Sequence, residues 1–164
     1  MMCAVPAHAA DPYLNCGDAD GKITIKPYKD KYNDTWIKII RKSIVAWNQS
    51  DANVNISVST DSTNEIRARS FDDTWYGLTS QTYDVSTGYT TKFTIKMNVR
   101  TIKRDAIDFP RFARSTLVHE FGHVFWLCDN PNTTKKTIMS YGRDRNTMIE
   151  PQPFDVTNVN KKYM

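Results

Sequence analysis

Two histidines four residues apart, His119 and His123, lie in the otherwise apolar stretch LVHEFGHVFWL (Leu117–Leu127). In an α-helix, side chains four residues apart lie one above the other, so both imidazoles can point at the same place. Imidazole nitrogens at this spacing bind divalent ions such as zinc. The chain is therefore expected to build a helix here, with one side packed in the core and the other presenting a metal site.

Glu120 directly follows the first of these histidines. It lies about 100° round the helix from His119, close enough to reach a water molecule on a metal ion without binding the ion itself. A carboxylate in that position acts as a general base, because zinc lowers the pKa of its water toward about 7. The alternative is two surface histidines beside a solvated glutamate. Two of the chain's three histidines have this spacing, which favours the metal site.

The metal site needs a third protein ligand, and it must be Asp, Glu, Cys or Tyr because no histidine follows His123. Asp129 follows His123 by six residues, which is a rotation of about 240° around the helix axis if the helix simply continues. It can therefore reach the ion only if the chain bends back first. Asn130-Pro131 indicates that the helix does break nearby.

The other elements follow from the spacing of apolar residues. Helical periodicity predicts an amphipathic helix over residues 33–50, and the histidine-bearing helix is expected to start at Asp108. Alternation predicts strands, of which Trp75–Asp84 is polar enough for an edge strand. The predicted strands are residues 22–28, 54–60, 65–71, 75–84 and 89–99, and a short helix over residues 153–163 closes the chain. This order indicates an α+β fold.

Composition excludes several classes of protein. The 164 residues suffice for one domain, and 40% hydrophobic with 24% charged residues is typical of a globular chain. No apolar run approaches the roughly 18 to 20 residues that span a bilayer. The net charge of +4 is compatible with a nucleic-acid partner, but the Lys and Arg residues are scattered along the sequence and do not form a cluster. We therefore expect neither a nucleic-acid nor a membrane partner. We also expect the protein to be a monomer.

The first residues indicate secretion. They carry no charge, are rich in small side chains and include Ala7-His8-Ala9, a pattern typical of a signal cleavage site. Residues 1–9 are therefore predicted to be a signal remnant, residues 10–164 the single mature domain, and the location secreted or periplasmic. Removal of Cys3 leaves Cys16 and Cys128, for which we predict a disulfide; two buried free thiols are the alternative.

The residues from His119 to Tyr141 resemble a known family. His119, Glu120 and His123, with Asp129 six residues later and Thr137-Ile138-Met139-Ser140-Tyr141 beyond, are similar to the motif and Met-turn of the metzincin zinc endopeptidases. The resemblance, closest to the matrixin branch, implies that Asp129 is the third ligand and that Met139 forms the apolar floor under the metal. It also implies a metzincin-like zincin fold: a small twisted mixed sheet, an active-site helix, the Met-turn and a C-terminal helix.

Two residues depart from the family pattern. Trp126 stands where the family has a glycine that lets the chain turn, and a tryptophan at positive φ carries a steric cost. The third ligand therefore stays open between Asp129 and Cys128, because thiolate also binds zinc. The Met-Ser-Tyr sequence is closer to the astacin and serralysin turn, which implies that Tyr141 stabilises an oxyanion; a packed tyrosine is the alternative.

The function implied is a secreted zinc metalloendopeptidase that hydrolyses peptide bonds in extended polypeptides. Glu120 is expected to act as general base on water bound to one catalytic zinc, and a protein or peptide substrate is expected to pair with the edge strand Trp75–Asp84. The alternative is a noncatalytic binding protein that keeps a structural zinc on a protease-like scaffold.

Two further features bear on ligands. Arg143 and Arg145 follow the Met-turn and are expected to be solvated, although they could favour acidic groups beside the metal. The stretch Asp18-x-Asp20-Gly21 is compatible with calcium, but the other ligands of a calcium loop are absent from it.

Overall fold

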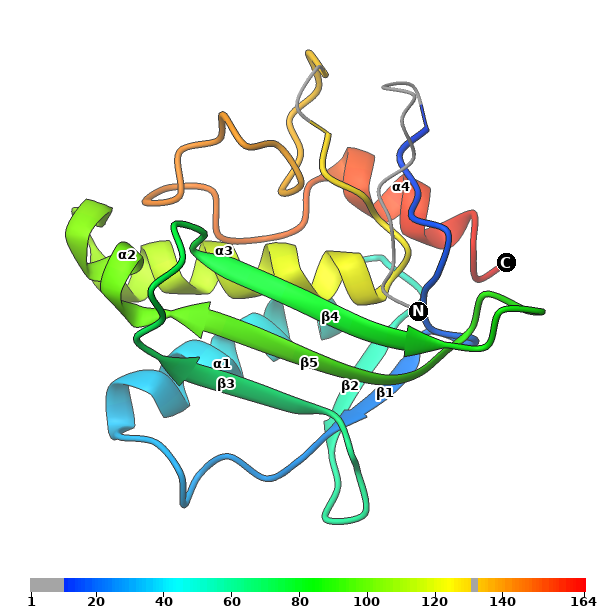
Figure 1. Cartoon of the computed structure of the whole chain (residues 1–164). Coiled ribbons are helices and arrows are strands. Elements are labelled where there is room, and N and C mark those ends of the chain that lie inside the picture. The colour runs from blue at the N-terminus through cyan, green and yellow to red at the C-terminus, as the bar shows by residue number, and fades with distance from the viewer. Residues whose placement is uncertain (1–10, 131–132) are drawn as a thin grey trace.

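Figure 1 shows the computed structural model of the chain, which describes residues 11–130 and 133–164. The predicted signal remnant, residues 1–9, lies outside the described residues. Among those that are described, no helix has the length and apolar character needed to cross a membrane.

The strands form two small sheets. β1 (Lys22–Ile25) pairs in parallel with β2 (Asn55–Val58). In the second sheet β5 (Thr90–Asn98) is central, with β3 (Glu65–Arg69) parallel to it on one side and β4 (Gly77–Tyr83) antiparallel on the other. β4 therefore ends this sheet on one side, and the predicted edge strand is confirmed.

The sequence predicts one mixed sheet, and in this respect the fold prediction is wrong. Between the two sheets, Asn64 donates from Nδ2 to the carbonyl of Thr24 in β1 (3.0 Å) and accepts at Oδ1 from the backbone N–H of Phe93 in β5 (2.8 Å). The Ser62 hydroxyl also donates to Thr24 (2.9 Å), and Lys26 N–H donates to the Asn64 carbonyl (2.8 Å). Side chains and loop backbone, not a ladder, therefore join the two sheets.

Helix α1 (Asp34–Asn48) begins as predicted, because Asn33 caps it by accepting from the N–H of Trp36 (3.1 Å). Near the other end Trp47 is fully buried. Its indole N–H donates to the carbonyl of Val118 (2.9 Å), and its ring meets that of Phe125 edge-on at 5.3 Å. One side chain thus fixes α1 against the histidine-bearing helix.

That helix, α3 (Phe109–Val124), is buried almost throughout from its second turn onward. Asp108 caps it by accepting from the N–H of Arg111 (3.0 Å), as predicted, and Pro110 fits its first turn. The helix ends at Val124, before Leu127, the predicted last residue. In Figure 1, α3 and α1 lie on the same side of the larger sheet. α3 contacts β4 and β5, and α1 packs on α3 and β2.

Two shorter helices complete the described elements. α4 (Pro153–Asn160) confirms the predicted closing helix. α2 (Val99–Asp105) is missed by the sequence pattern because β5 runs into it without a turn residue. Asn98 makes this change possible: its side chain accepts from the N–H of Phe71 (3.1 Å) and of Arg100 (3.3 Å), so it ends the strand and caps the helix.

The burial of Trp47 predicts a large effect on stability. Trp47→Ala should lower the free energy of unfolding by about 3 to 5 kcal/mol, because it leaves a cavity and removes the indole hydrogen bond to α3. Urea denaturation measures this, with Val45→Ala on the exposed side of α1 as the matched control, expected to stay within about 0.5 kcal/mol. Equal losses in the two variants would show that Trp47 does not fix α1 to α3.

Candidate metal centre

The structure brings together the two histidines and Asp129. Among the described residues, these three form the group of His, Cys, Asp or Glu side chains able to hold an ion, with ligand atoms all within 4.8 Å of one another. Oδ1 of Asp129 lies 3.1 Å from Nε2 of His119 and 3.6 Å from Nε2 of His123. Cys128, the alternative ligand, turns away and donates from Sγ to the carbonyl of Asp11 (3.1 Å).

Both histidines direct Nε2 at this point. Nδ1 of His119 lies 2.9 Å from the carbonyl of Ile138, and Nδ1 of His123 lies 2.8 Å from that of Leu127. A carbonyl only accepts, so each Nδ1 carries a proton, and the Nε2 of a neutral ring is then free to bind an ion. Burial and the nearby charge of Arg143 lower the pKa of His119, which keeps that ring neutral near pH 7.

Two acceptors therefore face each other. Burial raises the pKa of Asp129, whereas a hydrogen bond from His119 and the charges that the two imidazoles carry when protonated lower it to about 2, so its carboxylate is charged. Its Oδ1 is buried and has no hydrogen-bond partner among the described residues. A lone pair of His119 and a carboxylate oxygen at 3.1 Å repel each other unless a cation lies between them. The residues present fit a divalent ion, and their chemistry suits zinc.

A strained bend after α3 brings Asp129 back to the histidines. Trp126 has φ of 73°, the only positive value among the described non-glycine residues. Its indole N–H donates to the carbonyl of Asp18 (2.8 Å), and the ring covers Gly17 so closely that a β-carbon there would lie 2.4 Å from it. Indole packing therefore holds a conformation that costs about 1 to 2 kcal/mol for a residue with a β-carbon.

The segment at Met139 supports the site from below. Buried Asp155, in the first turn of α4, accepts hydrogen bonds from the hydroxyl of Thr137 and from the N–H of Ile138 (2.8 Å). The carbonyl of Ile138 in turn holds His119. Met139 is buried against Gly122, where a β-carbon would lie 2.6 Å from its sulfur. Asp155 thus orients a ligand through Ile138, a role that the sequence analysis misses.

Glu120 and Tyr141 border the same point. Oε1 of Glu120 lies 4.0 Å from Nε2 of His119, and its Oε2 accepts from the hydroxyl of Thr79 (2.7 Å), a contact that sequence reasoning misses. Gly77 leaves room for the carboxylate, since a β-carbon there would lie 2.5 Å from it. The Tyr141 hydroxyl donates to Oδ2 of Asp129 (3.0 Å). The general-base and oxyanion roles of Glu120 and Tyr141 stay predictions.

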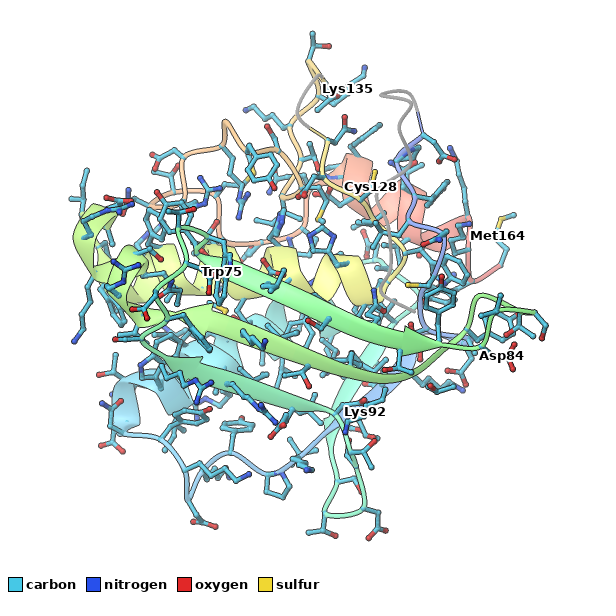
Figure 2. All side chains as sticks on the ribbon, viewed as in Figure 1. Trp75, Asp84, Lys92, Cys128, Lys135 and Met164 are labelled. Atoms are coloured by element: carbon cyan, nitrogen blue, oxygen red, sulfur yellow. The ribbon has the colours of Figure 1, made fainter. Side chains whose placement is uncertain are left out.

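The site opens into a cavity of about 560 Å³. Its walls include β4 and Trp75, which precedes that strand and is labelled in Figure 2. Arg143 and Arg145 also line it, so the expectation that they are solvated is wrong for Arg143, which is 7% exposed. Arg143 donates to the Ser115 hydroxyl (3.1 Å) and to the Ser140 carbonyl (2.8 Å). Burial lowers its pKa to about 9, which still leaves it charged at pH 7.

The predicted Cys16–Cys128 disulfide is wrong, because Cys128 is a free, buried thiol. The calcium prediction stays a prediction. Oδ2 of Asp18 accepts from the N–H of Gly21 (2.7 Å), and Oδ1 of Asp20 accepts from that of Lys22 (2.9 Å), so both carboxylates stabilise their own turn.

Comparison with known proteins gives likenesses in fold to solved structures. No protein-family model matches the chain, and no curated protein matches it. A chain of a solved structure described as "GM1 bound form of the ECX AB5 holotoxin" is similar, with a TM-score of 0.61 and 14% sequence identity over 87% of this chain and 80% of that chain. Such low identity shows a shared fold alone, and GM1 is a ligand of that toxin.

This likeness corrects the family and fold assignments. No family model supports the metzincin or matrixin assignment, and the similar chain shares the fold alone. The predicted metzincin-like zincin fold is therefore replaced by two small sheets with helices, in a fold similar to that of the toxin chain.

The predicted activity is corrected with it. Because no family model supports the metzincin assignment, the predictions of a hydrolase, a protease and a zinc metalloendopeptidase lose the resemblance that carried them. The spacing of His119 and His123 and the turn at Met139 remain relevant to the structure, because they bring the two histidines and Asp129 together as a group able to hold an ion.

The bend at Trp126 predicts an unusual order of stabilities. Both Trp126→Ala and Trp126→Gly remove the indole, but only alanine keeps a β-carbon at positive φ. Trp126→Gly should therefore be about 1 kcal/mol more stable than Trp126→Ala, the reverse of the order at ordinary positions. Thermal or urea unfolding of the two variants measures the difference. A more stable alanine variant would show that this bend is not left-handed.

The free thiol predicts pH-dependent labelling. Burial, reinforced by the charge of Asp129, raises the pKa of Cys128 to about 11, so little thiolate is present at pH 8 in the folded chain. Iodoacetamide should label Cys128 at least about tenfold more slowly in the folded than in the urea-unfolded protein. Labelling should speed up as the pH rises toward 11. Peptide mass spectrometry locates the label. A Cys128 that resists labelling after unfolding without reductant would instead indicate a disulfide.

Proposed function

We propose that this chain is a secreted binding protein whose cleft holds a divalent ion, with zinc as the ion its ligands suit best. The observation that carries the proposal is the buried, unpartnered Oδ1 of Asp129, 3.1 Å from a bare imidazole nitrogen. A cation between His119, His123 and Asp129 would satisfy three acceptors at once. The uncharged, small-residue sequence that ends at Ala9 supports secretion.

The ion would take part in binding and not only in stability. A structural zinc site is closed by four protein ligands, whereas the group here offers three among the described residues. When bound, zinc supplies a Lewis acid that attracts a donor atom of the partner. The cavity that borders His119 and Glu120 leaves space for such an atom.

The partner best supported by the cleft is an extended polypeptide. β4 has β5 on one side only in the described sheet, and Gly77, Leu78, Thr79 and Gln81 of this strand line the cavity. An extended chain can pair with such an edge through its backbone, which gives affinity without strict sequence requirements. Arg143 and Arg145 on the cavity wall add positive charge for an acidic side chain of that partner.

Glu120 and Tyr141 would hold the partner at the ion. Glu120 is 4% exposed and fixed by Thr79, so its Oε1 can accept an N–H or O–H proton from the bound chain. Burial and the charge of Asp129 raise the pKa of Tyr141 to about 12, so its hydroxyl stays protonated and able to donate. These two side chains would place one acceptor and one donor beside the partner's polar groups.

Metal analysis tests the ligand set. The native protein should contain one zinc per chain, and both His119→Ala and Asp129→Ala should weaken zinc binding at least about 100-fold, because each removes a direct ligand. Glu120→Gln and Cys128→Ala are the matched controls and should keep the zinc. Elemental mass spectrometry after dialysis against a graded chelator gives the affinities. Zinc lost in Cys128→Ala but retained in Asp129→Ala would overturn the assignment of the third ligand.

Casein, an extended polypeptide, tests the role of the cleft. The native protein should bind casein in the presence of zinc and lose at least about tenfold in affinity after chelation, while the casein stays intact. Glu120→Ala should keep its zinc and weaken the binding, since it removes an acceptor at the ion. Zinc-dependent fragmentation of casein by the native protein, abolished in Glu120→Ala, would overturn the proposal of a noncatalytic protein.

A further inference from the structure

A second cavity, of about 370 Å³, lies between α1 and α3, away from the metal centre. Four cationic side chains line it: Lys38 and Lys42 from α1, and Arg111 and Arg114 from α3. In each helix the two residues are one turn apart, so each pair lies on one face. The charges appear scattered along the sequence, and the packing of α1 on α3 gathers them.

Three of these four charges form no ion pair with the described residues around them. Among the described residues, Lys38, Lys42 and Arg111 form no ion pair, and the acid paired with Arg114 is the exposed Glu150, at 2.9 Å. The Nε–H of Arg114 is buried and has no acceptor in the described part of the chain. No acidic residue lines the cavity. Like charges brought together in this way repel each other, and a bound anion would remove that repulsion.

The position of two of the cations is fixed. The Nε–H of Arg111 donates to the carbonyl of Asn146 (2.5 Å), and its backbone N–H is held by the capping carboxylate of Asp108 (3.0 Å). Arg114 is held by Glu150 and has a side chain only 15% exposed. Planar guanidinium groups held in place suit the oxygens of phosphate or sulfate groups, and flexible lysines complete the neutralisation.

The rest of the cavity wall is mainly apolar. Ile39, Pro110 and Ile149 line it together with Thr35, which offers a hydroxyl. The volume exceeds what a single inorganic ion needs. The lining therefore matches a ligand with an anionic group at one end and an apolar group at the other.

We infer that the cavity between α1 and α3 is a binding site for a small phosphate or sulfate ester, held by Lys38, Lys42, Arg111 and Arg114 through its anionic group and by Ile39 and Ile149 through its apolar part. The site shares no lining residue with the metal centre. It can therefore be present or absent whatever the outcome of the zinc experiments.

An NMR titration of backbone amides at constant ionic strength tests this inference. Phenyl phosphate should bind saturably and shift amides of α1 and α3 around Lys38 and Arg114. Inorganic phosphate should shift the same amides with at least about fivefold weaker affinity, and phenol should not saturate, because the site needs both the charge and the apolar group. Equal affinities for inorganic phosphate and phenyl phosphate would show that the cavity binds only the anionic group. That result would overturn the inference that its ligand is an ester.

Charge variants complete the test. Lys38→Gln/Lys42→Gln, at two exposed positions, should weaken phenyl phosphate binding at least about tenfold, since it removes two charge-assisted contacts to the anionic group. Lys92→Gln/Lys103→Gln removes the same charge from exposed positions elsewhere and should bind like the native protein. Equal weakening in both double variants, no saturable binding, or shifts confined to the metal centre would overturn the site.

Discussion

The structure depends on one backbone conformation, the left-handed bend at Trp126. Without it the chain would leave α3 in the direction of the helix axis, and Asp129 could not return to the histidines. The bend is held from both ends of the chain: the indole contacts Gly17 and Asp18, and the ammonium of Lys162 lies 4.5 Å from its ring centre. The N-terminal segment, α3 and the C-terminal segment are therefore stabilised at the same point where the candidate ligand set is completed.

The sequence predicts most elements but not how the sheets divide. Periodicity locates α1, α3 and the five strands, because each buries one face and the pattern of apolar residues records it. It cannot show that Asn64 bridges β1 and β5 with its side chain, since hydrogen bonds between distant segments leave no periodic signal. It also misses α2, where a strand becomes a helix at Asn98 without a glycine or proline.

The candidate site divides in the same way. The spacing of His119 and His123 is a local feature and could be found from sequence, whereas the place of Asp129 depends on a bend for which Trp126 is an improbable residue on steric grounds alone. Sequence reasoning also misses Thr79 and Asp155, which orient Glu120 and His119 from β4 and α4. A family resemblance gave roles to these residues, but no family model supports that resemblance, and a fold by itself does not define a function.

The buried carboxylate of Asp155 has a consequence for assembly of the fold. It joins α4, near the end of the chain, to the loop whose Ile138 carbonyl sets the orientation of His119. A ligand imidazole is therefore correctly aimed only after the last helix has docked. Metal affinity in this chain would act as a reporter of completed folding, because a molecule with α4 undocked would present the histidines without the support that keeps Nε2 turned toward Asp129.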